Sequence, residues 1–224
     1  LATDSNDVIT ININDNPSIA NLNTIAGKTA GVVTATLAST SAADLASLST
    51  AATDVITIPV SDTISVSALN TLAGKTAGVV TATATTGDTA SFSSLATDSN
   101  DVITININDN PSVSALNTIA GKTAGVVTAT LASTAKADLV ALSTASTDVI
   151  TVPVSDTVSV TELNTIAGKT GGPVTATVTT GNTASYSALA TDSNDIITIN
   201  ISDNPSVSDL NTIAGKTGGV VTAT

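Results

Sequence analysis

The chain contains no cysteine, methionine, histidine, tryptophan or arginine, and its aromatic residues are Phe92 and Tyr186 alone. These absences exclude disulfide bonds, thiol or imidazole catalysis, zinc sites of cysteine and histidine, and haem ligation through those side chains. Nucleic acid is a poor partner, because a net charge of −12 repels phosphate and almost no aromatic surface is present for base stacking.

Charged residues are also scarce. They make up 11% of the chain, and the mean hydropathy of +0.39 is too apolar for a disordered tail. No apolar run approaches the roughly 18–20 residues that cross a bilayer, so we expect no membrane span. The sequence begins at Leu1 without a signal peptide, and we expect a fragment of a longer chain or filament.

What the chain does contain is repetition. The string LATDSND begins at Leu1, Leu95 and Leu189, and this spacing of 94 residues defines super-repeats 1–94 and 95–188 and a partial one, 189–224. Within them the segment LNT(I/L)AGKT recurs every 47 residues. A strand-like segment recurs every 23 or 24 residues and always carries one threonine, in a column of ten: Thr10, Thr34, Thr57, Thr81, Thr104, Thr128, Thr151, Thr175, Thr198 and Thr222. The repeating unit is therefore a coil of 23 or 24 residues.

The first half of each coil alternates in polarity. In one such segment Ile56, Ile58 and Val60 share one face, and Thr57 lies on the other. β-Branched residues with this period of two predict a strand with one buried face. The equivalent faces of neighbouring coils would then form one apolar layer.

The second half of each coil changes to a period of three, in which Val66, Leu69 and Leu72 form one stripe of a short helix. Ser159 and Glu162 match a capping box. Five glycines follow these helices, where we expect a left-handed C′ residue, and each precedes a lysine that suits the helix dipole: Gly27, Gly74, Gly121, Gly168 and Gly215. The helical turns of the intervening coils have weaker propensity and are expected to be 3₁₀ or irregular.

A strand, a helical turn and a return within one coil complete one turn of a β/α solenoid. Because no single coil can bury its apolar face, neighbouring coils must stack and share one core. We therefore predict an α/β repeat fold, a single right-handed β/α solenoid over 1–224 with a parallel sheet and about ten coils, roughly 45–50 Å long. Without capping repeats, both sheet edges, near Val8 and at Val221–Thr224, are open to further strands, so we expect the chain to assemble with itself, end to end or laterally.

The repeat is similar to leucine-rich repeats in its length and its strand-plus-helix content. At the level of residues, V-(I/V)-T-(I/A) followed by S-V-x-x-L-N-T-I-A-G-K-T resembles tandem repeats of very large, acidic, cysteine-free surface proteins of marine cyanobacteria, and of structural proteins of their phages. The resemblance covers nearly the whole chain. It implies an extracellular filament, sheath or stalk component and carries over no catalytic residues.

The segment Ala26-Gly27-Lys28-Thr29 and its four copies resemble the end of a phosphate-binding loop. That loop needs a glycine five positions before Gly27, where Leu22 stands, so helix C-capping explains the segment better. An active site also needs a unique constellation, whereas most polar residues here recur four or five times. We expect no enzyme activity, and no cofactor apart from the calcium considered next.

Two aspartate columns bracket every second strand, with Asp7 and Asp15 as their first members. The members of a pair lie roughly 26 Å apart along an extended strand, which is too far to share an ion. Two denser clusters could hold calcium weakly if carbonyls and waters complete the coordination shell, or could instead form Asx turns: Asp98, Asn100, Asp101, Asp192, Asn194 and Asp195.

The threonine column is the most specific surface feature. Equally spaced hydroxyls on a flat parallel sheet could order water and bind ice or a polysaccharide surface. Alternatively, threonine stacks with like neighbours because it favours strands. An asparagine also recurs every 47 residues, and we expect it to satisfy backbone groups between coils: Asn23, Asn70, Asn117, Asn164 and Asn211.

These patterns predict first a structural protein that forms a rod, sheath or fibril on the surface of a cell or virion. An extracellular location suits the absence of cysteine, methionine and tryptophan, because those side chains oxidise readily. The first alternative is a module whose threonine face binds ice or polysaccharide, and the second is a calcium-dependent adhesin segment.

Overall fold

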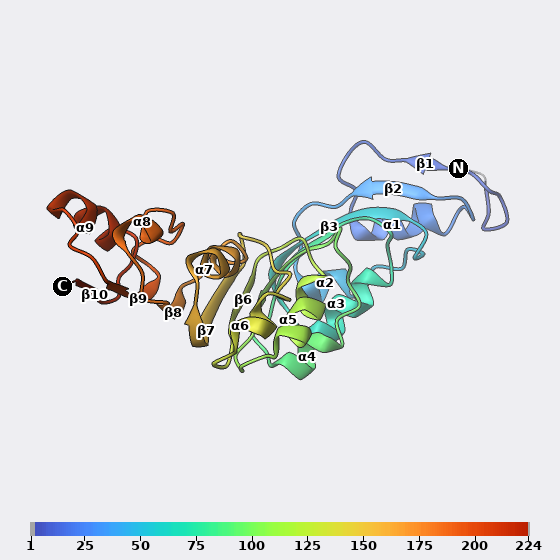
Figure 1. The fold of residues 1–224 in the computed structure, drawn as a ribbon. Helices are drawn as coiled ribbons and strands as arrows, with labels where there is room; N and C mark the ends of the chain where they lie inside the picture. Colours follow the sequence, from blue (N-terminus) through green and yellow to red (C-terminus); the bar gives the residue numbers. More distant parts are fainter. Residues whose placement is uncertain (1–2, 224) are drawn as a thin grey trace. The chain divides into compact units, whose positions relative to one another are not determined.

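The computed structural model describes residues 3–223 and contains ten parallel strands that alternate with short helices, which confirms a β/α solenoid of about ten coils (Figure 1). Leu1, Ala2 and Thr224, which the predicted first repeat and last strand include, lie outside the described residues. The chain divides into two compact units, Leu1–Asn106 with Gly121–Val126, and Ile107–Ala120 with Val127–Thr224.

Within each unit the strands are parallel and are hydrogen-bonded in chain order. The first unit contains β1 (Ile11–Asn12), β2 (Val33–Thr36), β3 (Val55–Ile64), β4 (Val80–Ala84) and β5 (Val102–Asn106). The second contains β6 (Val127–Thr130), β7 (Val149–Val158), β8 (Val174–Val178), β9 (Ile196–Ile201) and β10 (Val221–Ala223). Stacked coils impose this order, because each coil contributes one strand.

Helices of eight residues alternate along the chain with shorter ones. The longer helices are α1 (Ile19–Ala26), α3 (Val66–Ala73), α5 (Val113–Ala120), α7 (Val160–Ala167) and α9 (Val207–Ala214). The shorter ones are α2 (Ala42–Leu45), α4 (Thr89–Ser93), α6 (Lys136–Leu139) and α8 (Thr183–Tyr186). In the first unit, α1 to α4 lie along one side of the strands (Figure 1).

The intervening turns are thus α-helical, and the expectation of 3₁₀ or irregular structure there is wrong. At α2, α4 and α8 the N-cap side chain compensates for the weak propensity, because Ser41, Asp88 and Asn182 each accept a hydrogen bond from a backbone N–H three residues later. The capping box of α7 is confirmed: Ser159 accepts from the Glu162 N–H, and the Glu162 carboxylate accepts from the Ser159 N–H.

The left-handed glycines predicted at the helix ends are not found. Gly74 has a φ of −69°, in the right-handed region, and no glycine among residues 3–223 has a positive φ. The helix ends by tightening instead, because Gly74 N–H donates to the Asn70 carbonyl and Lys75 N–H donates to the Leu72 carbonyl. This pattern satisfies the last carbonyls of α3 without a left-handed residue.

The predicted alternation of buried and exposed residues is confirmed. Ile56 and Ile58 of β3 are fully buried, whereas Thr57 between them is half-buried. Val60 is also half-buried, because the register of β3 against β4 shifts after Pro59 and takes this segment out of the alternation. The core therefore lies between one face of the strands and the apolar stripes of the helices.

Two of the shorter helices bury an aromatic ring. Phe92 of α4 and Tyr186 of α8 have no exposed surface. A Cβ atom at Gly87 would lie 3.4 Å from the Phe92 ring, and one at Gly181 would lie 3.4 Å from the Tyr186 hydroxyl. The equivalent coils of α2 and α6 have threonine in place of the glycine and leucine in place of the ring. A ring therefore fits where a glycine leaves room for it.

The register of the sheet is staggered relative to the sequence repeat. Residues paired across neighbouring strands are 21 or 22 positions apart, as in Thr36 with Thr57 and Pro59 with Thr81, except after the register shifts of β3 and β7, where the separation falls to 20. Each strand is therefore displaced by two residues relative to the strand before it. Close backbone contact fixes this register, because a Cβ at Gly78 would lie only 2.5 Å from the Ile56 carbonyl oxygen.

Candidate functional site

The polar residues that repeat along the chain gather at the contacts between successive coils, and the threonine of each A-G-K-T segment lies at the centre of one such contact. The Thr76 hydroxyl accepts hydrogen bonds from the N–H groups of Ile56 and Gly78, both at 2.7 Å, and donates to the Ile56 carbonyl at 2.8 Å. The other copies make the same bonds: Thr29, Thr123, Thr170 and Thr217. The segment that resembles a phosphate-binding loop therefore holds two coils together.

The first aspartate column is buried beside these threonines. Asp54 is 4% exposed; its Oδ1 accepts from the Val33 N–H of the preceding coil and its Oδ2 from the Ala51 N–H, both at 2.8 Å. Later members of the column repeat both bonds: Asp101, Asp148 and Asp195. A buried carboxylate is stable only when such donors replace its water, so these aspartates act as clamps between coils.

The second aspartate column caps the short helix of the preceding coil. Asp62 accepts from the N–H of Ala42, the first residue of α2, at 2.8 Å. Asp156 accepts in the same way from α6, and Asp203 from the N–H of Thr183 in α8. The Thr183 hydroxyl also donates to Asp203 at 2.7 Å, and these two bonds lower the pKa of Asp203.

Four of the five asparagines in the column satisfy backbone groups between coils, as predicted, and for Asn211 the role stays a prediction. The Asn70 side chain donates to the Ser94 carbonyl at 2.8 Å and accepts from the Ala96 N–H at 2.7 Å. Equivalent residues do the same in both units: Asn23, Asn117 and Asn164. Each amide thus replaces a peptide group at the end of the next coil's short helix.

The lysine of the A-G-K-T segment also reaches a neighbouring coil. Lys75 donates to the carbonyls of Ala46, at 3.2 Å, and Leu48, at the C-terminal end of α2. Lys122 makes the equivalent contacts at the end of α4. The predicted interaction with a helix dipole therefore involves the C-terminal end of the short helix of the preceding coil.

The residues predicted as candidate calcium ligands form two Asx turns. Asp98 accepts from the Asn100 N–H at 2.7 Å, and Asp101 accepts from the Asp98 N–H at 3.2 Å. Asp192, Asn194 and Asp195 repeat the arrangement beside a cavity of about 120 Å³. Within residues 3–223, no group of three or more histidine, cysteine, aspartate or glutamate side chains is placed to hold a metal ion. Calcium binding stays a prediction.

The threonine column faces outward, since none of its ten members is buried. The staggered register, however, makes the column run diagonally across the strands. Thr57 lies beside Thr36, whereas Thr81 lies beside Pro59. Every second member of the column lies beside a threonine of the preceding strand, at an interval of 47 residues: Thr36 with Thr57, Thr83 with Thr104, Thr130 with Thr151, and Thr177 with Thr198. Two further pairs do not include a member of the column: Thr63 with Thr83, and Thr157 with Thr177.

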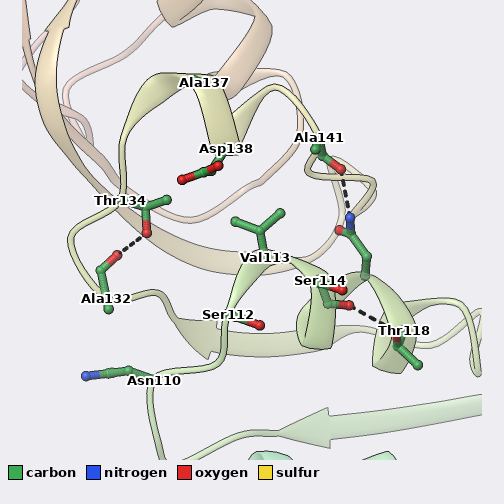
Figure 2. Close-up of a pocket in the computed structure, with 11 residues that line it drawn as sticks. Asn110, Ser112, Val113, Ser114, Thr118, Ala132, Thr134, Ala137, Asp138 and Ala141 are labelled. Atoms are coloured by element: carbon green, nitrogen blue, oxygen red, sulfur yellow. Dashed lines mark hydrogen bonds between the residues drawn. The ribbon is translucent and has the colours of Figure 1, made fainter.

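The second unit has a groove of about 780 Å³ that α5 and α6 border (Figure 2). Small apolar residues, hydroxyl groups and the Asp138 carboxylate line it, and Asn117 on its wall already donates to the Ala141 carbonyl at 2.7 Å. In the first unit a groove of about 590 Å³ uses equivalent positions of α3 and α4. The groove is therefore a repeated result of placing a short helix beside a longer one.

None of the helices in the described part of the chain is long and apolar enough to cross a membrane. Comparisons with models of protein families, with curated proteins and with solved structures found no match to this chain.

The repeat pattern predicts the role of the asparagine column but not the buried threonine or the two roles of the aspartates. The sequence does contain a signal for the buried threonine, because a glycine follows the A-G-K-T threonine by two residues in all five copies. That glycine allows the close backbone approach, and the threonine binds the N–H groups that the approach buries.

Proposed function

We propose that this chain is a structural repeat module, a segment of a rod, sheath or fibril on the surface of a cell or virion. The observation that supports the proposal is the side-chain network between coils. Buried threonines, aspartates and half-buried asparagines bond the backbone of one coil to the next, in addition to the hydrogen bonds of the parallel strands. Each coil is thus bonded to its neighbours at the strand, the turn and the helix, which resists separation of the coils.

The network also explains why the same polar residues recur. A binding or catalytic site needs its polar side chains free to contact a ligand. Here the recurring threonine, aspartate and asparagine side chains are bonded to main-chain groups of the protein itself. Repetition of these residues therefore serves length and stiffness, and the oxidation-resistant composition suits an exposed surface.

Mechanical unfolding of single molecules tests this function. The chain is held by its two ends and stretched, and we expect force peaks separated by the release of whole 47-residue units, about 16 nm each. Thr76→Val removes a bond between coils and should lower the force of one peak, whereas Thr71→Val, on the exposed surface of α3, should leave it unchanged. Smooth extension without force peaks would contradict a mechanical role. Labelling of intact cells by an antibody against the chain tests the location.

The paired threonines support a second function, binding to ice or to a polysaccharide surface. The pairs are exposed or half-exposed and recur at one interval of 47 residues. Thr83→Leu together with Thr104→Leu should abolish any ice recrystallisation inhibition or polysaccharide binding by the chain. Thr71→Leu together with Thr118→Leu, on helices, is the matched control. Equal activity in both double variants would exclude the threonine face.

A further inference from the structure

In three of the short helices, α2, α4 and α8, the third residue is bonded to the N-cap side chain, and in α6 it is not. In α2 the Ser41 hydroxyl donates to Asp44 Oδ2 at 2.7 Å. In α4 and α8 the third residue is a serine, whose hydroxyl donates to the N-cap side chain at 2.6 and 2.7 Å: Ser91 to Asp88, and Ser185 to Asn182. In α6 the N-cap is Ala135, which has no polar side-chain atom, and the third residue is Asp138. The Asp138 carboxylate therefore lacks the partner that Asp44 has.

The charged side chains close to Asp138 in sequence are engaged with the next coil. Lys136 Nζ lies 3.2 Å from Glu162 Oε2 of α7 and also donates to the Thr157 carbonyl. Asp156 accepts from the Lys136 N–H at 2.8 Å. The lysine of α6 thus pairs with Glu162 and leaves the exposed Asp138 carboxylate to solvent or to a ligand.

Asp138 lines the groove of about 780 Å³ that α5 and α6 border (Figure 2). Four small apolar side chains line the same groove: Val113, Ala132, Ala137 and Ala141. Pockets that hold drug-sized ligands have volumes of roughly 300–1,000 Å³, so this groove has room for more than one side chain of a ligand. In the groove of α3 and α4 the position of Asp138 is taken by Ser91, whose hydroxyl is already bonded. The groove of α5 and α6 therefore combines an apolar wall with a carboxylate that its own N-cap does not engage.

We propose that this groove binds a basic segment of a partner protein through a lysine side chain. The methylene stem of that lysine packs against Val113 and Ala137, and its ammonium group donates to the Asp138 carboxylate. The other ammonium protons face the hydroxyl groups of Ser112 and Thr134, which line the groove as acceptors. The net charge of −12 attracts a cationic segment and repels an anionic one.

The inference goes beyond the structural function, because it adds a partner of opposite charge at one coil. The repeats show which exchange distinguishes this coil. Ala135 stands where the first super-repeat has Ser41, and the loss of that hydroxyl releases the carboxylate. Restoring a serine there should therefore close the site without changing the net charge.

An NMR titration of the isotope-labelled chain tests the inference. The probe is a blocked peptide of alanines with one lysine at its centre, and the amide signals of Ala137 and Ala141 should shift until the groove is saturated. Ala135→Ser ties Asp138 to the N-cap, and Asp138→Asn removes its charge, so each should raise the dissociation constant about fivefold. Asp44→Asn is the matched control, because it removes the same charge in α2, where the N-cap already engages the carboxylate. It should change the dissociation constant less than about twofold.

A chain whose signals do not shift with the lysine peptide would overturn the inference. Equal effects of Asp138→Asn and Asp44→Asn would also overturn it, because they would show attraction by net charge alone. Unchanged binding in Ala135→Ser would show that release of the carboxylate does not create the site. Butylammonium that binds as tightly as the peptide would reject a protein segment as the occupant. The force measurements on single molecules do not involve the peptide, so the loss of this site would leave the structural function standing.

Discussion

At the scale of single residues, buried hydroxyl groups bond to backbone groups between coils, in addition to the hydrogen bonds of the parallel strands. The Thr76 hydroxyl serves as the partner of two N–H groups that face each other across the Ile56–Gly78 contact. A buried N–H without a partner costs about 1–3 kcal/mol. The threonine is therefore required by the close approach of the coils and not by any ligand.

Replacing this hydroxyl tests that requirement. Thr76→Val keeps the shape but leaves the Ile56 and Gly78 N–H groups without a partner, and we expect a loss of about 2–5 kcal/mol in the free energy of unfolding. Thr76→Ser keeps the hydroxyl and should lose much less. Thr71→Val removes a bond to a carbonyl of its own helix and is the control. Urea titration followed by circular dichroism gives the three values, and equal stability of the valine and serine variants would contradict the assignment.

Two glycines of one repeat should respond differently to alanine. A Cβ at Gly78 would lie 2.5 Å from the Ile56 carbonyl oxygen, whereas a Cβ at Gly74 would lie 3.5 Å from the Asn70 carbonyl oxygen. Gly78→Ala must push two coils apart and should cost about 3 kcal/mol or more. Gly74→Ala fits a right-handed conformation and should change stability by less than about 1 kcal/mol, in the stabilising direction. Chemical denaturation of both variants measures the contrast.

Tyr186 gives the chain a pH-sensitive residue. Burial raises the pKa of its phenol above the ordinary value of 10.0. The phenol oxygen lies 2.8 Å from the carbonyl oxygens of Thr179 and Asn200, and the hydroxyl donates to these two acceptors. A raised pKa means that this residue stabilises the fold fully below pH 10.0, and that the contribution is lost as pH rises through the higher folded value. Ultraviolet absorbance of tyrosinate follows this residue alone, because the chain has one tyrosine and no tryptophan. A midpoint at or below the ordinary value would show that the ring is not buried.

At the scale of elements, periodicity was sufficient to predict strands and helices but not how they pair. The period-two run around Ile56 and the period-three run from Val66 to Leu72 depend on local sequence and were predicted correctly. The register depends on which backbone atoms touch after the coils stack. The glycine at position 78 brings its coil onto Ile56, which displaces the strands by two residues from the sequence repeat. This displacement, invisible in the aligned repeats, moves Thr57 from beside Thr34 to beside Thr36.

The capping box of α7 gives a prediction for the single glutamate. Hydrogen bonds from the Ser159 N–H and hydroxyl, and then from Lys136, lower the pKa of Glu162 below its ordinary value of 4.5. The cap therefore stabilises α7 above that value and is lost as pH falls through the lower folded pKa. An NMR titration of the chain with labelled glutamate should show a midpoint below 4.5, and Ser159→Ala should raise it. An unchanged midpoint in Ser159→Ala would show that the Ser159 hydroxyl does not donate to the Glu162 carboxylate.

At the scale of the whole molecule, every bond between coils is short in sequence. The side-chain bonds that join neighbouring coils link residues 14 to 29 positions apart. The free energy of unfolding should therefore be the sum of one contribution from each coil and one from each contact between neighbouring coils. The dense contacts of Thr76 or Asp54 repeat in each 47-residue unit, so removing whole units should leave the remaining contacts intact.

Excision of residues 95–188 tests this additivity. The deletion joins Ser94 to Leu189, and the sequence that follows, LATDSND, is the one that follows Ser94 in the intact chain. Every bond from one coil to the next therefore has its usual partner at the new junction, and we expect a folded, shorter chain with unchanged ellipticity per residue. Deletion of 95–164 removes fewer residues but breaks the 47-residue phase, so its junction would place helix residues where a strand is needed. If the chain without 95–164 folds as well as the chain without 95–188, the coils do not depend on matched neighbours. If both chains unfold, stability does not come from the contacts between neighbouring coils alone, and the additive description is wrong.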